Sequence, residues 1–277
     1  MDITLSLFPK FYKHLDVHQL ADLVREVGLD TTNAVIRDGY WVSSSGLAKE
    51  LPEFVQAMRG EGLEVKFATA GFSAADLLAD PTPLAIMAES GIADFRIGYF
   101  QESKEGPRAS LLAARSQLEQ LAPLCELHRI RAVYQVHHGT LITNASAAWH
   151  LVNGLSSKWI GIELDPGNQG FEGFEYWGRS VRLLADYLAA VGVKDTAPSR
   201  DLLCTHDPDK GWRRAWAPLD EGVTNWHDLV RSLAAVNFQG TFVFMPFYHA
   251  DDSALMTEKL KREVAYLRGV IASIELG

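Results

Sequence analysis

Residues 159–170 read WIGIELDPGNQG, a strand-like run that ends in a sharp turn. The segment from Trp159 to Leu164 favours a buried strand, and the Asp-Pro-Gly-Asn sequence that follows cannot continue it. Glu163 and Asp165 are two positions apart and therefore point to the same side of the chain. A buried strand that ends in acidic side chains indicates an active site, although Asp165 could instead cap the turn through its own backbone.

The segments around this stretch alternate between short apolar strands and amphipathic helices. Strands are predicted at 3–8, 33–37, 64–69, 94–99, 131–137, 159–164, 190–194 and 241–246. Helices are predicted to begin at Asp16 and Pro52 and to span 82–90, 110–128, 144–155, 176–189, 225–236 and 253–274, with a long loop at 196–224. Crossovers of this length make the strands parallel.

Eight strand–helix units without a composition break predict a closed (β/α)8 TIM barrel, formed as a single domain by residues 1–277. The turns lack GxGxxG and GxxxxGK[ST], which argues against a dinucleotide fold and a P-loop. The active site of such a barrel lies at the carboxyl ends of its strands. Side chains at those ends include Gln135, His137, His138, Glu163, Asp165, Asn168, Lys194, Asp195, Met245, Phe247 and His249.

Composition narrows the classes of partner. The formal net charge of −9 argues against binding to nucleic acid or to an anionic membrane. No apolar run approaches the length of a membrane span, and the first residues, MDITLSLFPKF, do not read as a secretion signal. We therefore expect a cytoplasmic protein. Cys125, in an apolar helical pattern, is expected to be a core residue.

Four short motifs, taken in order, resemble those of the xylose isomerase-like family. YQVHHG is similar to the strand-five motif of that family, ELDPGN to strand six and VGVKD to strand seven, and PLDEGVTNW with FQGTFVFM is similar to its closing segment. The family contains sugar and sugar-phosphate isomerases and epimerases as well as metal-dependent AP endonucleases. The resemblance covers most of the chain and implies the same barrel, with a divalent metal at its mouth.

The resemblance also implies where the four metal ligands would stand. The family places Glu, Asp, His and Glu on strands five to eight, and these positions are occupied here by Gln135, Asp165, Gly192 and Met245. A histidine that follows the strand-six aspartate in the family is replaced by Asn168. Only Asp165 keeps a ligand of the family type. We therefore predict a degenerate metal site and no cofactor.

A divalent metal (Mn, Mg, Co or Zn) would bind only if the site had been rebuilt. The side chains that could rebuild it are Asp165, His137, Glu163 and His206, and Asp207 and His249 could also reach the mouth. The other reading of Glu163 is a buried acid paired with Arg96 or Lys194. Lys194 could hold an anionic oxygen of a substrate, or it could neutralise the two acids.

These considerations assign roles to eight side chains. Asp165, Lys194 and His137 are the candidate catalytic residues, His137 because imidazole titrates near neutral pH. The candidate substrate-binding residues are Gln135, Glu163, Asn168, His206 and Trp212. Trp212 is included because aromatic rings stack on sugars. Packing against the barrel rim is the other role open to the aromatic loop residues and is the one expected of Trp226.

The function most consistent with this pattern is binding of a small polar, sugar-like metabolite at the barrel mouth. An isomerase or epimerase follows from the resemblance, but Gln135 and Met245 cannot replace the two glutamates that transfer protons in the family. Two alternatives remain. One is a non-catalytic binding barrel, and the other is a metal-independent lyase or dehydratase that uses His137 or Lys194. A homodimer is expected from the resemblance alone.

Overall fold

Parallel strands form the central sheet of the computed structural model, which describes residues 2–204, 206, 210–247 and 252–275. The strand order is β2-β1-β11-β8-β7-β6-β5-β4-β3, and every neighbouring pair is parallel. Their bounds are β1 (Ile3–Leu7), β2 (Thr31–Thr32), β3 (Ala34–Ile36), β4 (Phe67–Ala70), β5 (Asp94–Arg96), β6 (Arg131–Gln135), β7 (Ile160–Leu164), β8 (Leu188–Val193) and β11 (Gly240–Phe244).

The two ends of this sheet meet at a single residue. β2 pairs with β1 and β3 pairs with β4, and only Asn33 separates β2 from β3. Asn33 is fully buried, and its amide side chain contacts Ser6 Oγ at 2.6 Å and Thr69 Oγ1 at 3.4 Å. β2 and β3 are therefore two halves of one barrel strand, and the predicted (β/α)8 barrel is confirmed.

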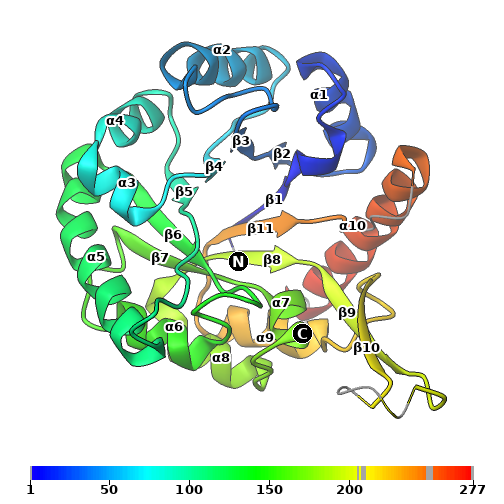
Figure 1. Cartoon of the computed structure of the whole chain (residues 1–277). Helices are drawn as coiled ribbons and strands as arrows, with labels where there is room; N and C mark the ends of the chain where they lie inside the picture. Colours follow the sequence, from blue (N-terminus) through cyan, green and yellow to red (C-terminus); the bar gives the residue numbers. More distant parts are fainter. Residues whose placement is uncertain (1, 205, 207–209, 248–251, 276–277) are drawn as a thin grey trace.

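Helices surround the sheet, as Figure 1 shows in a view along the barrel. They are α1 (Val17–Glu26), α2 (Leu47–Gly60), α3 (Ala74–Ala79), α4 (Thr82–Glu89), α5 (Pro107–His128), α6 (Ala145–Val152), α8 (Trp177–Leu184), α9 (Trp226–Ala235) and α10 (Ser253–Glu275). Asp16 begins α1 with the expected capping box. Cys125 and Trp226 are fully buried, as expected, and each packs in the core.

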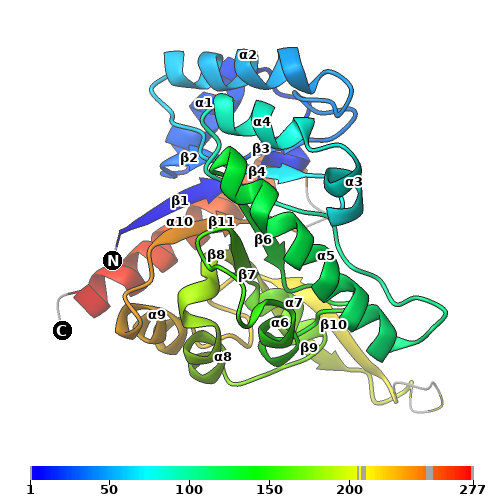
Figure 2. The same ribbon diagram turned by 90° about the vertical axis from the view of Figure 1, so that its left-hand side faces the viewer.

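The segment predicted as a long loop is a β-hairpin instead. β9 (Asp195–Arg200) pairs antiparallel with β10 (Trp212–Ala217), and the hairpin projects from the barrel (Figures 1 and 2). β9 contains Pro198, and proline argues against a strand because it has no backbone N–H to donate to a neighbouring strand. Proline is tolerated at a strand edge that faces no neighbour. A two-stranded sheet has such edges, so the prediction of a loop was wrong.

Several other elements differ from the sequence prediction. The helix expected to begin at Pro52 begins at Leu47, so Pro52 lies inside α2 and not in its first turn. The helix predicted at 176–189 ends at Leu184, a short 3-10 segment (Ala185–Tyr187) follows, and β8 already begins at Leu188. The turn after β7 continues into a short helix, α7 (Pro166–Phe171). α3 was missed, although Ser73 and Asp76 form a capping box at its start. Within the described residues, no helix is long and apolar enough to cross a membrane.

Candidate functional site

A small cavity lies at the carboxyl ends of the barrel strands. Its volume is about 140 Å³, and it is lined by Phe8, Lys10, Arg37, Arg96, Tyr99, Gln135, His137, Lys194, Met245 and Phe247. The predicted site residues Gln135, His137 and Lys194 therefore line the same cavity.

Asp165 caps the turn, one of the two roles that the sequence left open, and uses both of its carboxylate oxygens in hydrogen bonds. Its Oδ1 accepts a hydrogen bond of 2.8 Å from the backbone N–H of Asn168 and so caps α7. Its Oδ2 lies 2.6 Å from Nε2 of Gln135 and 3.2 Å from Nζ of Lys194. Complete burial raises the pKa of the carboxyl group, and the nearby Lys194 opposes that rise. The turn cap thus fixes a carboxylate against a buried ammonium group.

Lys194 stands beside this carboxylate with only 4% of its surface exposed. Its Nζ also donates to Oδ1 of Asn168 at 3.0 Å. The rings of Trp216 and Phe247 cover it, with centroids at 4.6 and 4.5 Å from Nζ. Burial lowers the pKa of Lys194, whereas Asp165 opposes that shift. The ion pair and two aromatic faces favour the charged form of the lysine.

Gln135 directs its amide oxygen away from the acids. Its Oε1 accepts hydrogen bonds from Arg96 at 2.7 Å and from Tyr99 at 2.5 Å. Its Nε2 donates to Asp165 and, at 3.2 Å, to Glu163, and it also contacts Sδ of Met245 at 3.7 Å. Because two donors already use the oxygen, Gln135 presents hydrogen-bond donors where a metal would need an electron pair.

Glu163 lies below Gln135 and is fully buried. Among the described residues its Oε2 has no hydrogen-bond partner, and no ion pair joins Glu163 to Arg96 or Lys194. Burial raises the pKa of Glu163 to about 7, the charge of Arg96 opposes the rise, and Asp165 adds to it. The predicted pairing with Arg96 or Lys194 is therefore a longer-range interaction rather than a salt bridge.

The residues at the inherited metal position do not fit a metal ion. A Cβ atom on Gly192 would lie 2.6 Å from Oδ2 of Asp165, so the carboxylate occupies space that a histidine side chain would need. Met245 offers a thioether, which does not suit a hard cation. Among the described residues, no group of three or more His, Cys, Asp and Glu side chains could hold a metal. His206, one of the candidates for a rebuilt site, lies in an exposed turn between the two strands of the hairpin.

His137 lies on the cavity wall with a fixed tautomer. Its Nδ1 is 2.6 Å from the carbonyl oxygen of His138, and because a carbonyl can only accept, Nδ1 carries the proton. The unprotonated Nε2 is then the acceptor of the ring. Burial lowers the pKa of His137 to about 3, and Lys194 contributes to the decrease. His137 is therefore a neutral imidazole at physiological pH.

Asn168 links the histidine segment to the lysine. Besides accepting from Lys194, its Oδ1 lies 2.8 Å from Nδ1 of His138, and its Nδ2 donates to the carbonyl oxygen of Val136. The position that the resemblance assigns to a histidine thus holds an amide with three different partners. Asn168 is fully buried and orients Lys194 rather than facing the cavity.

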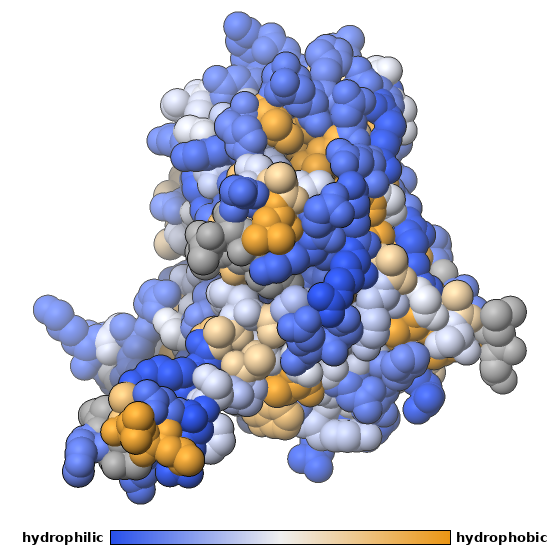
Figure 3. All heavy atoms as spheres, turned by 90° about the vertical axis from the view of Figure 1, so that its right-hand side faces the viewer, coloured by the Kyte–Doolittle hydropathy of each residue, from blue (hydrophilic) through white to orange (hydrophobic). Residues whose placement is uncertain are grey.

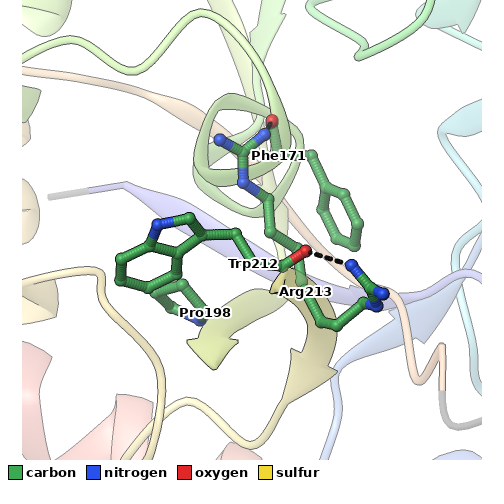
Figure 4. A pocket seen from close by; sticks show the side chains of 5 residues that line it. Phe171, Pro198, Trp212 and Arg213 are labelled. Atoms are coloured by element: carbon green, nitrogen blue, oxygen red, sulfur yellow. Dashed lines mark hydrogen bonds between the residues drawn. The ribbon is translucent and has the colours of Figure 1, made fainter. Parts of the chain in front are cut away.

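Trp212 lies away from this cavity, whereas Trp216 of the same hairpin lies against Lys194. Trp212 is 52% exposed and, with Phe171, Pro198, Arg213 and Arg214, lines a separate pocket of about 680 Å³. Figure 4 shows its indole beside Pro198 in that pocket. His206 is also apart from the cavity, and Asp207 and His249 lie outside the described residues. The structure therefore groups six of the eight predicted side chains and separates Trp212 and His206 from them.

Three cationic side chains at the cavity were not among the predicted site residues. Lys10 follows β1, Arg37 follows β3, and Arg96 ends β5. From the sequence, Arg96 was expected only as a possible partner of Glu163. The strand-end rule, when applied to the first strands as well as the last four, would have found Lys10 and Arg37, whereas Arg96 lies inside the strand predicted at 94–99.

Asp195, another strand-end residue, has a structural role. Its carboxylate accepts from the backbone N–H and Oγ1 of Thr224, from Thr196 N–H and from the indole of Trp226 at 2.9 Å. Burial raises the pKa of Asp195 to about 6, and these hydrogen bonds oppose the shift. Asp195 therefore anchors the segment between the hairpin and α9 to the end of β8.

The fold and this position of the polar cluster define a parallel (β/α)8 barrel with its candidate site at the carboxyl ends of the strands. Residues 84–269 match the family described as "Xylose isomerase-like TIM barrel". The chain belongs to the xylose isomerase-like TIM barrel family. No curated protein matches the sequence.

Solved structures with the same fold have low sequence identity to this chain. D-psicose 3-epimerase from Clostridium cellulolyticum H10, crystallised with D-tagatose, matches with a TM-score of 0.72 and 13% identity over 97% of this chain and 99% of its own. A probable 3-DHS dehydratase from Bacillus anthracis matches with a TM-score of 0.69 and 17% identity, covering 96% and 98%. A Mycobacterium smegmatis protein of this fold, in complex with magnesium, has a TM-score of 0.66 and 15% identity, covering 97% of each chain.

Proposed function

We propose that the barrel mouth binds a small, sugar-like hydroxycarbonyl compound, and that the ammonium group of Lys194 provides the positive charge that a divalent metal supplies in the metal-dependent members of the family. The observation that supports this most directly is the 3.2 Å contact between Lys194 and Asp165, the one residue of the family ligand type. Lys194 also lines the cavity, so its remaining N–H can reach a bound ligand.

The chemistry available to such a site is proton transfer next to a carbonyl group. A carbonyl oxygen that accepts from Lys194 would become more negative as the neighbouring C–H bond breaks, and a fixed ammonium in a site with little water stabilises that charge. The proton would pass to Nε2 of His137, and the bond electrons would move onto the carbonyl oxygen to give an enolate. Return of this proton to the former carbonyl carbon, with transfer of the neighbouring hydroxyl proton to the former carbonyl oxygen, completes an isomerisation. Protonation of the original carbon from the opposite face by water completes an epimerisation, and departure of a β-hydroxyl group as water, with the proton held by His137, completes a dehydration.

Two residues support Lys194 in this role without contacting the ligand. Asp165 and Asn168 each hold Nζ at hydrogen-bonding distance, so the ammonium is positioned before a ligand arrives. Trp216 and Phe247 cover it and exclude water. Because the ammonium group is already in place, fewer groups of the site have to be reoriented during the reaction.

A second function, binding without turnover, is favoured by one specific observation. The lowered pKa of about 3 makes His137 a weak base. Such a weak base removes a proton only from a C–H bond that the positive charge of Lys194 has made much more acidic. If Lys194 does not activate the ligand enough, the same cavity serves as a binding site for a small metabolite.

Exchange of carbon-bound hydrogen in D₂O separates these functions. The protein, treated with a chelator, is incubated with small ketoses and hydroxy-keto acids, and ¹H NMR follows loss of the signal at the carbon next to the carbonyl. We expect exchange that continues in the presence of the chelator and is lost in Lys194→Met. Binding without exchange would support the non-catalytic barrel. Exchange that required an added metal would contradict the proposal.

A further inference from the structure

Besides Lys194, the cavity is lined by three further cations whose charge no nearby carboxylate of the described residues balances. Lys10, Arg37 and Arg96 come from barrel strands that follow one another around one half of the sheet, whereas Lys194 follows β8 on the other half. The whole chain has a formal net charge of −9, so this concentration of cations at one cavity is a local feature. A binding function explains it better than overall charge does.

Within the described residues, no carboxylate lies at ion-pair distance from these three cations. Arg96 is 6% exposed and donates to the neutral amide oxygen of Gln135. Lys10 and Arg37 are partly exposed, and Nζ of Lys10 lies over the rings of Phe11 and Phe247 at 5.5 and 5.4 Å from their centroids. Buried and half-buried charges in proteins are normally paired, so these groups lack the anion that would neutralise them.

The acids that face the cluster do not supply that anion. Asp165 is already paired with Lys194. Glu163 lies below Gln135, and the charge of Arg96 acts on its pKa from a distance. Burial lowers the pKa of Lys10, and repulsion by Arg37 and Arg96 lowers it further, which shows that the three cations act on one another. An incoming anion would relieve this repulsion.

We infer that the ligand of the barrel mouth carries an anionic oxygen group, a carboxylate or a phosphate ester, held by Lys10, Arg37 and Arg96 while Lys194 contacts the other end of the molecule. This inference rests on the proposed function and adds the substrate class to it. The volume of about 140 Å³ suits a small ligand, so three-carbon compounds are suitable first probes. Guanidinium groups suit either anion, because they donate two parallel N–H bonds.

Three compounds with the same three-carbon skeleton test the inference. Calorimetry or ligand-observed NMR measures the affinity of the intact protein for glyceraldehyde, glycerate and glycerol 3-phosphate at low ionic strength. We expect at least one of the two anions to bind about ten-fold or more tightly than glyceraldehyde, since hydrogen bonds between charged groups are stronger than neutral ones. The anion that binds more tightly identifies the group as carboxylate or phosphate.

Variants separate this site from general electrostatics. Lys10→Gln and Arg37→Gln should remove most of the preference for the anion, while Lys49→Gln, the same change at an exposed lysine of α2, should leave it intact. Added salt should reduce the preference in the wild type. Equal affinity for the neutral and anionic compounds, or no binding of either anion at millimolar concentration, would overturn the inference.

The experiments distinguish failure of this inference from failure of the proposed function. Anion binding that needs Lys10 and Arg37, combined with no C–H exchange in any hydroxycarbonyl compound, would support this inference and remove the catalytic form of the proposal. Exchange that depends on Lys194 with a neutral ketose as the best substrate would do the opposite. Circular dichroism of each variant shows whether it is folded.

Discussion

The ammonium of Lys194 lies 3.2 Å from Oδ2 of Asp165, and both side chains are buried. A charge pair in such surroundings is sensitive to loss of one partner, because the other is then left unpaired in a medium of low dielectric constant. The pair therefore makes predictions for stability as well as for ligand binding.

Replacement of Lys194 by Met should reduce the free energy of unfolding by about 3–5 kcal/mol, since Asp165 would remain buried without its cation. Asp165→Asn should also destabilise the protein. The double variant should be more stable than the sum of the two changes predicts, with a coupling of about 0.5–3 kcal/mol. Denaturant unfolding of the four proteins measures this coupling. Additive effects would show that the two groups do not interact.

The raised pKa of Glu163 predicts that the effect of its substitution on stability depends on pH. Its pKa is raised from 4.5 to about 7, so between these values the folded protein keeps a proton that the unfolded chain has lost. This contribution makes the wild type less stable as the pH rises through that window. Glu163→Gln lacks the contribution. Its stability relative to the wild type should therefore increase from pH 4.5 to pH 7 and then level off. Thermal unfolding at several pH values checks this, and a constant difference would contradict it.

Gly192 should not tolerate a side chain. An alanine Cβ would lie 2.6 Å from Oδ2 of Asp165 and would displace the carboxylate from Lys194. We expect Gly192→Ala to destabilise the protein by about 1–3 kcal/mol, as overpacking of a core does. Gly60→Ala in α2 is the matched control, because no atom lies within 4 Å of the position that its Cβ would take and alanine favours a helix. Equal stability of the two variants would show that Asp165 is free to move.

Trp216 and Trp212 should differ in their effect on Lys194, although they belong to the same strand. The ring of Trp216 lies 4.6 Å from Nζ of Lys194, whereas Trp212 lines the separate pocket. Trp216→Ala should uncover the lysine and increase its rate of acylation by a small amine-reactive reagent. Trp212→Ala should leave that rate unchanged. Mass spectrometry of the labelled peptide gives both rates, and equal labelling would contradict the role assigned to Trp216.

The exposed tip of the hairpin is a different feature from the site. Leu203 and Leu202 are 91% and 68% exposed there. Figure 3 shows hydrophobic side chains gathered at the end of the projecting part of the molecule. The expected homodimer remains a prediction, as does the cytoplasmic location.

The barrel could be predicted because its signals are local. Strand alternation put Glu163 and Asp165 on the same side, and the structure confirms this, since Nε2 of Gln135 contacts both acids. Spacing also brought Lys194 to the same edge as Asp165. These relationships depend on residues within a strand or at the ends of neighbouring strands, which periodicity describes well.

Other parts of the site depend on contacts between distant segments. Because β9 contains Pro198, it was not predicted as a strand. The pairing of β9 with β10 places Trp216, and not Trp212, over Lys194. The sequence could not show that Asp165 fills the space beside Gly192, because that requires the side-chain geometry of two strands. Lys10 and Arg37 were accessible to the strand-end rule but were not considered.

The most direct test of the central claim is a search for a metal at Asp165. Crystals soaked in Mn²⁺ would be measured at a wavelength where manganese scatters anomalously. We predict no anomalous peak within the ligand distance of about 2.0–2.6 Å from the Asp165 carboxylate, with Nζ of Lys194 still at that carboxylate. A peak at that distance, with Lys194 displaced from Asp165, would contradict the proposal that the lysine takes the place of the metal.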